Sequence, residues 1–459
     1  MTVLSPALVA NACVFVDYMY VSAMRTTLLY ASKTLAGGAG SSMLLASLES
    51  AFGLGQIGGA LTIGRMSDQH GRRVILSLCL ACTTVAYGLS SVALTTGSIL
   101  LLLLSRIPSG VSKQTTTVAR AIICDTARAD ERASALSSLY ASSTLGYALG
   151  PLLGGIFTER GKPVVIAALA ACAFALLTPA VAILLKETRP PPPQLAHAAA
   201  ALAPKSALMG GAWRSPALRR ALLQVALPEA GLVMHTAVAQ PLLAQHVGLS
   251  PLQTGHLASA AGAAAFILSS GPLPALLRRG LVHERNALPI INGLLLLPSV
   301  YLACRPTVRA IWLCLPAYAL SVSLQRAMST ALVSKAATAD SQGDALGALD
   351  VINSMCRVVV PLTAGILATR GSARSPILAM AAIGALGMLA AIPGGQPDAK
   401  PRMPPSAEGA SHPTSKMQSQ EPKSEATRPA CDTSGDAKPR RAGAGTRRVL
   451  RRSADAFDD

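Results

Sequence analysis

The chain has 459 residues, of which 51% are hydrophobic, 14% are charged and 3% are aromatic, and its mean hydropathy is +0.45. Soluble globular proteins carry roughly 25% charged residues, so this composition excludes an ordinary soluble domain. The formal net charge of +18 does not indicate a nucleic-acid partner, because the cations lie mostly in short links between apolar runs and aromatic side chains that could stack on bases are scarce.

Apolar runs near twenty residues recur along the chain, which is the length that a helix needs to cross a hydrocarbon core roughly 30 Å thick. Such runs must be helical because lipid offers the backbone no hydrogen-bond partner. We therefore predict an all-α membrane protein with twelve transmembrane helices in two six-helix repeats. The predicted spans are 6–27, 43–64, 74–95, 98–121, 133–157, 163–185, 220–243, 252–275, 287–304, 310–333, 345–368 and 376–393.

The two groups of six spans resemble each other in sequence. ADERASAL at 129–136 matches ADSQGDAL at 339–346, and the same offset pairs Pro151 with Pro361. Repeats that begin six helices apart run parallel, an arrangement typical of transporters whose substrate site lies between the halves near the midplane. The predicted domains are an N-terminal bundle at 1–185, a proline-rich cytosolic linker at 186–219, a C-terminal bundle at 220–393 and a disordered cytosolic tail at 394–459.

Lysine and arginine indicate the orientation, since they concentrate in cytoplasmic links. With both termini in the cytosol, the inner links hold 14 of these residues and the outer links hold 7. We predict a multi-pass integral membrane protein with both termini cytosolic. The first apolar run has no basic stretch before it and no evident cleavage site, so we interpret it as a retained span.

Three segments carry recognisable motifs. GRMSDQHGRR contains Gly64, Asp68, Gly71, Arg72 and Arg73, and GYALGPLLGG contains Gly146, Gly150, Pro151, Gly154 and Gly155. The first resembles the second-to-third-helix loop signature of the major facilitator superfamily. The second resembles the fifth-helix motif of its proton-driven antiporters, and RIPSG at 106–110 resembles the fourth-helix signature. Together with ADERASAL, these motifs resemble the tetracycline-antiporter-like branch and, within it, an orphan eukaryotic member.

The resemblance implies a secondary transporter that works by alternating access. It also implies that Asp68 caps a helix N-terminus in the opposite half and that Arg72 bonds an acid at the inner end of helix four, for which Asp125 is the candidate. We expect Gly64 and Gly71 to let the backbone pass close to a neighbour in a tight turn. A clasp made in one conformation would bias a two-state equilibrium. The alternative is a basic loop that only sets orientation.

Ionisable residues inside spans are costly and usually face a partner or a wet cavity. The candidate proton-coupling and cavity residues are Asp17, Arg106, Lys113, Glu229, His235, Arg326, Asp350 and Arg357. Arg106, Lys113 and Arg120 recur at intervals of seven, which predicts one stripe along a continuous fourth helix. The resemblance implies an essential first-helix carboxylate, here Asp17, and a fourth-helix arginine beside the cavity, here Arg106.

Several of these residues also have a purely structural explanation. Arg120 and Asp350 can be interfacial, and Lys113 can extend its ammonium toward an interface. His235 can be a satisfied packing residue. Asp350 and Arg357 lie seven residues apart and can pair with each other.

We therefore expect a proton-driven transporter of a small organic solute that acts as a monomer in the bilayer. We expect no metal and no cofactor. Arg106 and Lys113, with no acid before Asp125 in that helix, favour an anionic substrate; a neutral or zwitterionic site is the alternative. Related antiporters carry prolines after the first-helix acid, and their absence after Asp17 argues against drug-like substrates. A transport-dead receptor or scaffold is the alternative function, whereas no nucleotide, zinc-hydrolase or serine-hydrolase motif indicates an enzyme.

Overall fold

The computed structural model describes residues 5–37, 40–128, 131–189, 215–239, 244, 246–279, 284–337, 342–371 and 374–391. Within these residues the chain is helical and contains no strand. The predicted tail and most of the predicted central linker lie outside them.

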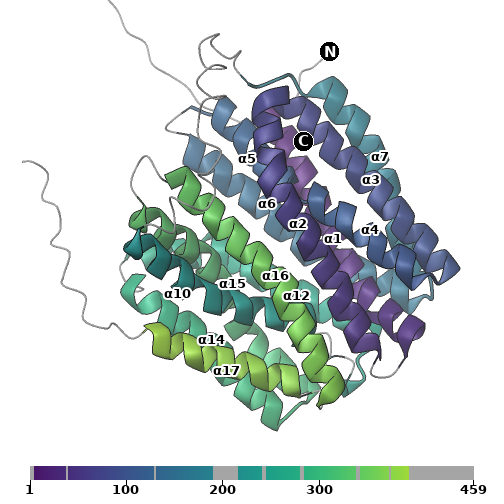
Figure 1. Ribbon diagram of the computed structural model, residues 1–459, viewed down its shortest axis with the longest axis vertical. Coiled ribbons are helices and arrows are strands. Elements are labelled where there is room, and N and C mark those ends of the chain that lie inside the picture. Colours follow the sequence, from purple (N-terminus) through teal and green to yellow (C-terminus); the bar gives the residue numbers. More distant parts are fainter. Residues whose placement is uncertain are drawn as a thin grey trace, which may run out of the picture. The chain divides into compact units, whose positions relative to one another are not determined.

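The first six predicted spans correspond to the purple-to-teal helices of Figure 1. They are α1 (Pro6–Ala36), α2 (Gly40–His70), α3 (Arg72–Thr96), α4 (Ile99–Ser112) followed by α5 (Thr115–Thr126), α6 (Arg132–Glu159) and α7 (Pro163–Leu184). Some helices run well past their predicted ends. In α1 the hydroxyls of Thr27, Ser32 and Thr34 bond to carbonyls one turn earlier, so these polar residues remain inside the helix.

The last six predicted spans form the second half. They are α10 (Pro216–Val233) followed by the π-helix η1 (Met234–Ala239), α12 (Pro251–Ser270) followed by α13 (Pro272–Arg278), α14 (Glu284–Cys304), α15 (Val308–Ala336), α16 (Gln342–Arg370) and α17 (Ser375–Ala391). The prediction of an all-α protein with twelve spans in two six-helix repeats is thereby confirmed. Because successive spans alternate in direction, Gly71 lies at one end of the bundle, which we call the motif end. Gly37 and Gly97 lie at the other, which we call the far end.

Six of the described helices are long and apolar enough to cross a membrane by length and composition alone: α1, α3, α7, α14, α15 and α16. The other predicted spans are broken into two pieces, short, or rich in glycine and serine. The glycine-rich α2 and α6 pack against the opposite half, α2 on α16 and α6 on α12, as Figure 1 also shows for α2 and α16. Their low hydropathy follows from this position, since they face protein as well as lipid.

The predicted continuous helix at 98–121 is wrong, because the fourth span breaks between α4 and α5. Pro108 removes a backbone donor inside α4. The chain then tightens, and the Lys113 N–H bonds to the Gly110 carbonyl at 3.2 Å. The new helix starts where Thr117 and Val118 donate to the Gln114 carbonyl. Lys113 therefore lies at a discontinuity within the membrane span.

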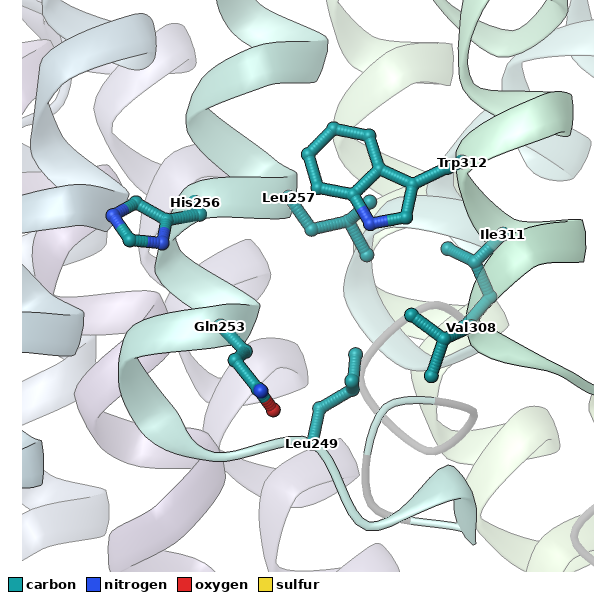
Figure 2. Close-up of a pocket in the computed structure, with 7 residues that line it drawn as sticks. All are labelled: Leu249, Gln253, His256, Leu257, Val308, Ile311 and Trp312. Atoms are coloured by element: carbon teal, nitrogen blue, oxygen red, sulfur yellow. The ribbon is translucent and has the colours of Figure 1, made fainter.

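Each half has its own buried apolar core among the described residues. In the first half the core includes Leu28, Leu76 and Phe174, and in the second half it includes Leu295 and Met380. A cavity of about 120 Å³ lies between α12 and the start of α15, with His256 and Trp312 among its lining residues (Figure 2). It is smaller than the roughly 300–1,000 Å³ of ligand pockets and has no charged lining residue, so it is a poor candidate for the substrate site.

Candidate functional site

A buried ion pair joins α1 to the break between α4 and α5. Asp17 Oδ2 accepts hydrogen bonds from Lys113 Nζ at 2.8 Å and from Thr115 Oγ1. The two charged side chains are only 3% and 6% exposed. Lys113 Nζ also lies 3.5 Å from the centroid of the Tyr18 ring. Lys113 thus points toward Asp17 inside the first half, and the helix break places it there.

A second, partly buried ion pair, which the sequence patterns did not predict, joins α1 to α2. Arg25 donates from Nε and Nη2 to the two oxygens of Glu49, at 3.2 and 3.0 Å. Arg106 lies nearby and interacts electrostatically with Glu49. Both members of the pair fall inside predicted spans, so a complete count of ionisable residues in the spans would have found them.

Arg106 is itself almost fully buried. It is 3% exposed, and its guanidinium carbon lies 4.7 Å from the centroid of the Phe52 ring. Among the described residues its Nε has no hydrogen-bond partner. Arg106 is therefore held inside the first half by a cation–π contact and by the charge of Glu49.

Two arginines of the second half are exposed and contact the first half. Arg357 Nη1 donates to Gln56 Oε1 at 3.0 Å, and the Arg326 guanidinium lies 5.9 Å from the centroid of the Tyr147 ring. Neither arginine has a carboxylate within ion-pair distance in the described part of the chain. Glu229 on α10 lies within electrostatic range of both.

The three cations of the fourth span contact three different helices. Arg106 faces α2 and Lys113 faces α1, whereas Arg120 Nη2 lies 3.9 Å from Asp350 Oδ2 on α16. The predicted single stripe is therefore wrong, because the break after α4 changes the direction of the side chains that follow. Asp350 pairs with Arg120 in the opposite half and not with Arg357, which bonds Gln56.

His235 lies in the π-helix η1 and stacks on Tyr318. Their ring centroids are 3.7 Å apart and the ring planes differ by 20°. The Tyr318 hydroxyl lies 3.3 Å from Ser299 Oγ. This arrangement favours the packing interpretation of His235 over a role in proton transfer.

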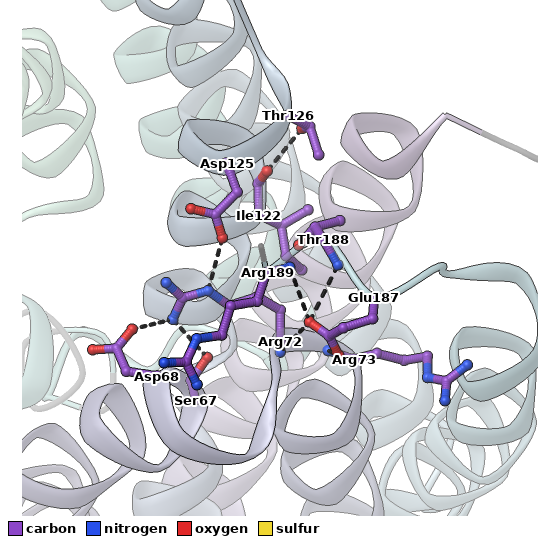
Figure 3. Close-up of polar contacts among 10 residues, drawn as sticks. All are labelled: Ser67, Asp68, Arg72, Arg73, Ile122, Asp125, Thr126, Glu187, Thr188 and Arg189. Carbon is purple, nitrogen blue, oxygen red and sulfur yellow. Dashed lines mark hydrogen bonds and ion pairs between the residues drawn. The ribbon is translucent and has the colours of Figure 1, made fainter. Parts of the chain in front are cut away.

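The charged motif between α2 and α3 forms a compact network that we call the clasp (Figure 3). Arg72 donates from Nε to Asp125 Oδ2 at 2.9 Å, and from Nη1 to Asp68 Oδ1 at 2.6 Å and Ser67 Oγ at 3.0 Å. Asp125 is thus the fourth-span acid that contacts Arg72. Asp68 is 63% exposed and pairs within its own half. Its contact with a helix N-terminus of the opposite half stays a prediction.

Glu187, which the motifs in the sequence did not single out, completes the clasp from the segment after α7. Its carboxylate accepts the backbone N–H groups of Arg72 at 2.8 Å and Arg73 at 3.2 Å, at the N-terminus of α3 (Figure 3). Gly71 makes this possible: its φ is +97°, and an added Cβ would lie 2.5 Å from Glu187 Oε2. At Gly64 the expectation that the backbone passes close to a neighbour in a tight turn is wrong. Gly64 lies inside α2, and no atom would lie within 4 Å of an added Cβ.

Replacing Glu187 by glutamine should weaken the clasp mainly near neutral pH. Partial burial would raise the pKa of Glu187, but the N–H groups of Arg72, Arg189, Arg73 and Thr188 outweigh it and lower the pKa below its ordinary value. The carboxylate therefore stabilises the fold above the ordinary carboxyl pKa of about 4.3, and this contribution is lost as the pH falls through the lowered value.

Thermal unfolding at pH 7 and at acid pH would measure this effect. The charge at the helix N-terminus contributes about 0.3–1 kcal/mol, and its hydrogen bonds to the Arg72 and Arg73 N–H groups add to this, so the variant should unfold at a lower temperature than wild type at pH 7 and together with it at low pH. Glu131 is the N-cap residue of α6 but makes no capping hydrogen bond, so Glu131→Gln controls for loss of a charge at a helix N-terminus without loss of hydrogen bonds. Equal effects of the two variants at pH 7 would contradict the prediction.

The fifth-span glycines of α6 form two packing surfaces. Gly146, Gly150 and Gly154 lie against the backbone of α1; a Cβ at Gly146 would lie 2.6 Å from the Phe15 carbonyl oxygen. Gly155 faces the opposite half, where a Cβ would lie 2.7 Å from the Pro251 carbonyl oxygen. Pro151 belongs to this second surface, since its carbonyl lies close to Gly255 of α12. Small residues here allow close helix contact both within and between the halves.

Polar contacts between the halves lie at the far end and also in the middle of the spans, where Ser50 Oγ donates to the Val358 carbonyl oxygen at 2.8 Å. The Tyr30 hydroxyl lies 2.9 Å from the Leu249 carbonyl oxygen and 2.6 Å from Thr254 Oγ1. The Leu252 N–H donates to Glu159 Oε2 at 3.2 Å. Toward the motif end, Arg120 Nη2 of the first half lies 3.9 Å from Asp350 Oδ2 of the second half.

The Major Facilitator Superfamily model matches residues 10–359. Tetracycline resistance protein, class B, of Escherichia coli is 37% identical over 109 residues, which cover 23% of this chain and 26% of that protein. Human solute carrier family 67 member A1 is 33% identical over 136 residues, covering 28% and 32%. The matched segments thus span about a quarter to a third of these curated relatives.

Solved structures show the same fold. The human organic anion transporter MFSD10 superposes with a TM-score of 0.58 at 20% sequence identity, and the superposition covers 84% of this chain and 100% of that chain. The nucleoside transporter NupG superposes with a TM-score of 0.65 at 12% identity, covering 84% and 98%. With its family model matched over most of the helical region, the chain belongs to the Major Facilitator Superfamily.

Proposed function

We propose that this protein is a secondary transporter that moves a small organic anion across a membrane by alternating access, driven by a proton gradient. One observation carries the proposal. In the first half, the buried Asp17–Lys113 ion pair contacts the Tyr18 ring through Lys113. The Tyr18 ring contacts the Tyr147 ring, which in turn contacts the exposed Arg326 of the second half. A proton-accepting group and an anion-attracting group thus lie on the two sides of one interface.

The charges of the spans support an anionic substrate. Asp17, Glu49 and Asp350 are each paired with a cation. Arg326 and Arg357 remain exposed at the interface, opposed by Glu229. The cations we assign to the substrate are therefore these two and not the Arg106 and Lys113 expected from the sequence, since Lys113 is neutralised by Asp17 and Arg106 is buried under Phe52.

Electrostatics strengthens this assignment. Attraction between unit charges is several times stronger near a protein interior than in bulk water, and arginine can bind an oxyanion with two parallel hydrogen bonds. The name of one structural neighbour, a human organic anion transporter, supports the same substrate class. A zwitterionic substrate that also contacts Glu229 is the alternative.

The Asp17–Lys113 pair supports proton coupling. A buried carboxylate that loses a nearby cation holds a proton more tightly, because burial favours its neutral form. Movement of Lys113 away from Asp17 would therefore change the proton occupancy of Asp17. The exchange needs no cofactor, and the proton gradient supplies the energy.

The contacts between the halves at the far end support alternating access. Hydrogen bonds join the halves at the far end, through Tyr30, Thr254 and the backbone N–H of Leu252. With the motif end in the cytosol, as the lysine and arginine distribution predicts, a far end held closed in this way belongs to the state that faces the cytosol. Closure of the motif end, with the clasp reaching the opposite half, would give the other state.

A transport assay in proteoliposomes tests the proposal. The full-length protein would be screened against acidic, neutral and basic solutes with and without a pH gradient. Benzenesulfonate, benzenesulfonamide and benzylamine form a matched set, and benzenesulfonate stays ionised across the pH range, so any pH dependence belongs to the protein. Strongest competition by benzylamine would overturn the anion assignment, and binding without flux would favour a receptor.

Replacing Arg326 or Arg357 by glutamine should weaken binding of the sulfonate more than that of the sulfonamide. A hydrogen bond to a charged group contributes about 1.5–3 kcal/mol, so we expect at least about a tenfold loss of affinity for the anion. Arg370→Gln, at an exposed arginine in the last turn of α16, is the matched control. An unchanged preference for the anion in both interface variants would contradict the prediction.

A further inference from the structure

Two tyrosine rings connect the buried ion pair of the first half to an arginine of the second half. Lys113 Nζ lies 3.5 Å from the centroid of the Tyr18 ring. The Tyr18 ring meets the Tyr147 ring edge-on, with centroids 5.1 Å apart and planes at 65°. The Arg326 guanidinium lies 5.9 Å from the centroid of the Tyr147 ring. We call this chain of four side chains the aromatic bridge.

Each contact in the bridge depends on orientation. A cation is attracted to the negative face of an aromatic ring, and an edge-to-face pair places the positive edge of one ring on the face of the other. A change in the position of Lys113 therefore alters the preferred tilt of Tyr18. That tilt in turn determines where Tyr147 presents its face to Arg326.

The two ends of the bridge have different strengths. Lys113 is shared between the Asp17 carboxylate at 2.8 Å and the Tyr18 ring at 3.5 Å. Neutralising Asp17 removes the carboxylate charge and leaves the ring as the main partner of the ammonium. Arg326 lies near the outer limit of about 6 Å for such contacts. An incoming anion can therefore draw Arg326 off the ring at small cost.

Building on the proposed function, we propose that Tyr18 and Tyr147 are positioning residues that couple the protonation of Asp17 to the placement of Arg326 in the opposite half. Binding free energies are reciprocal. If protonation of Asp17 changes the affinity of Arg326 for an anion by some factor, anion binding changes the proton affinity of Asp17 by the same factor. The bridge would thereby make proton binding and anion binding depend on each other across the interface.

Several other groups face Asp17 and enter its titration. Thr115 bonds its carboxylate, Cys13 lies one turn earlier on α1, and Cys79 and Tyr87 lie within electrostatic range from α3. From α6, Tyr147 lies within electrostatic range of Lys113 and also of Arg25 and Arg357. A test must therefore separate coupling through the rings from direct electrostatic coupling.

An infrared titration of the Asp17 carboxyl band in full-length protein makes this separation without any substrate. The band would be assigned by its loss in Asp17→Asn. We expect Arg326→Gln to shift its midpoint by at least about threefold in proton concentration, within the range of coupling energies seen between distant sites. In a Tyr147→Leu background the same replacement should produce no comparable shift.

Conservative variants control for structural damage. Tyr147→Phe and Tyr18→Phe keep the rings and should preserve the coupling, whereas Tyr18→Leu should abolish it; each variant would be checked for a monodisperse fold. A coupling that survives both leucine variants acts through space and overturns the bridge. So does a midpoint unaffected by Arg326→Gln, or an Asp17 band that does not titrate at all.

The outcome is distinguishable from failure of the proposed function. If benzenesulfonate and every other anion are neither bound nor moved, the anion transporter is wrong even when the titration shows coupling between Asp17 and Arg326. If anion transport is measured but the titration shows no dependence on the rings, the transporter stands and the bridge is wrong.

Discussion

Replacement of Asp17 by asparagine should abolish accumulation driven by a pH gradient while exchange of labelled for unlabelled solute continues. Asparagine keeps an oxygen that can accept from Thr115 and Lys113 but cannot bind and release a proton. The pair is buried, with side chains 3% and 6% exposed, so no bulk water replaces the missing carboxylate. Proteoliposome uptake with an imposed pH gradient, compared with counterflow, would measure both activities.

The variant also leaves Lys113 without its counter-ion. Removing one partner of a buried pair commonly costs about 3–5 kcal/mol, so low expression alone would be ambiguous. The double variant Asp17→Asn with Lys113→Gln removes both charges and should recover folding without recovering coupling. Glu131→Gln, at an exposed carboxylate, should transport normally. Normal pH-driven uptake by a correctly inserted Asp17→Asn protein would show that the proton is carried elsewhere.

Replacement of Gly155 by valine should reduce flux at least about tenfold without preventing insertion. Gly155 lies where α6 meets α12 at the far end, and an added Cβ would lie 2.7 Å from the Pro251 carbonyl oxygen and 3.2 Å from Gly255 Cα. Overpacking a tight contact costs about 1–3 kcal/mol, which the protein avoids by separating the halves there. The state closed at the far end should therefore lose population.

The accessibility of a cysteine introduced at Thr254, which is buried and contacts Tyr30 across the halves, would report this shift, in a background whose accessible native cysteines have been replaced. Labelling should be faster in Gly155→Val than in the parent. Gly58→Val is the matched control, since nothing lies within 4 Å of its added Cβ. Unchanged labelling together with unchanged flux would show that the far-end contact is not part of the transport cycle.

The charges inside the spans show where prediction from sequence succeeded and where it failed. Asp17 and Lys113 could be chosen as candidates because ionisable groups inside spans need partners. Glu49 carries the same signal within the predicted span at 43–64, as does Arg25 within the span at 6–27. That Asp17 pairs with Lys113 and Glu49 with Arg25 could not be predicted, because it depends on how α1, α2 and the fourth span pack.

Glu187 illustrates a second kind of residue that sequence patterns do not reveal. A glutamate just after an apolar span is commonly interfacial, and its partners here are backbone N–H groups of Arg72 and Arg73, more than a hundred residues earlier. Backbone donors leave no pattern in the sequence. The sequence sign of this contact was Gly71. A glycine at the start of a helix permits the positive φ seen here and leaves room for the Glu187 carboxylate against the turn.

The sequence by itself determined the helical spans, their number and the superfamily. The reason is that a bilayer requires runs of about twenty apolar residues with every backbone group bonded internally, and this requirement is local. Only the tertiary structure decided which charges meet. The break at Lys113, the shared position of Tyr18 and Tyr147, and the exposure of Arg326 and Arg357 at the interface all depend on contacts between distant helices. Those contacts arise from close packing of small residues such as Gly155 against the opposite half, which no local periodicity encodes.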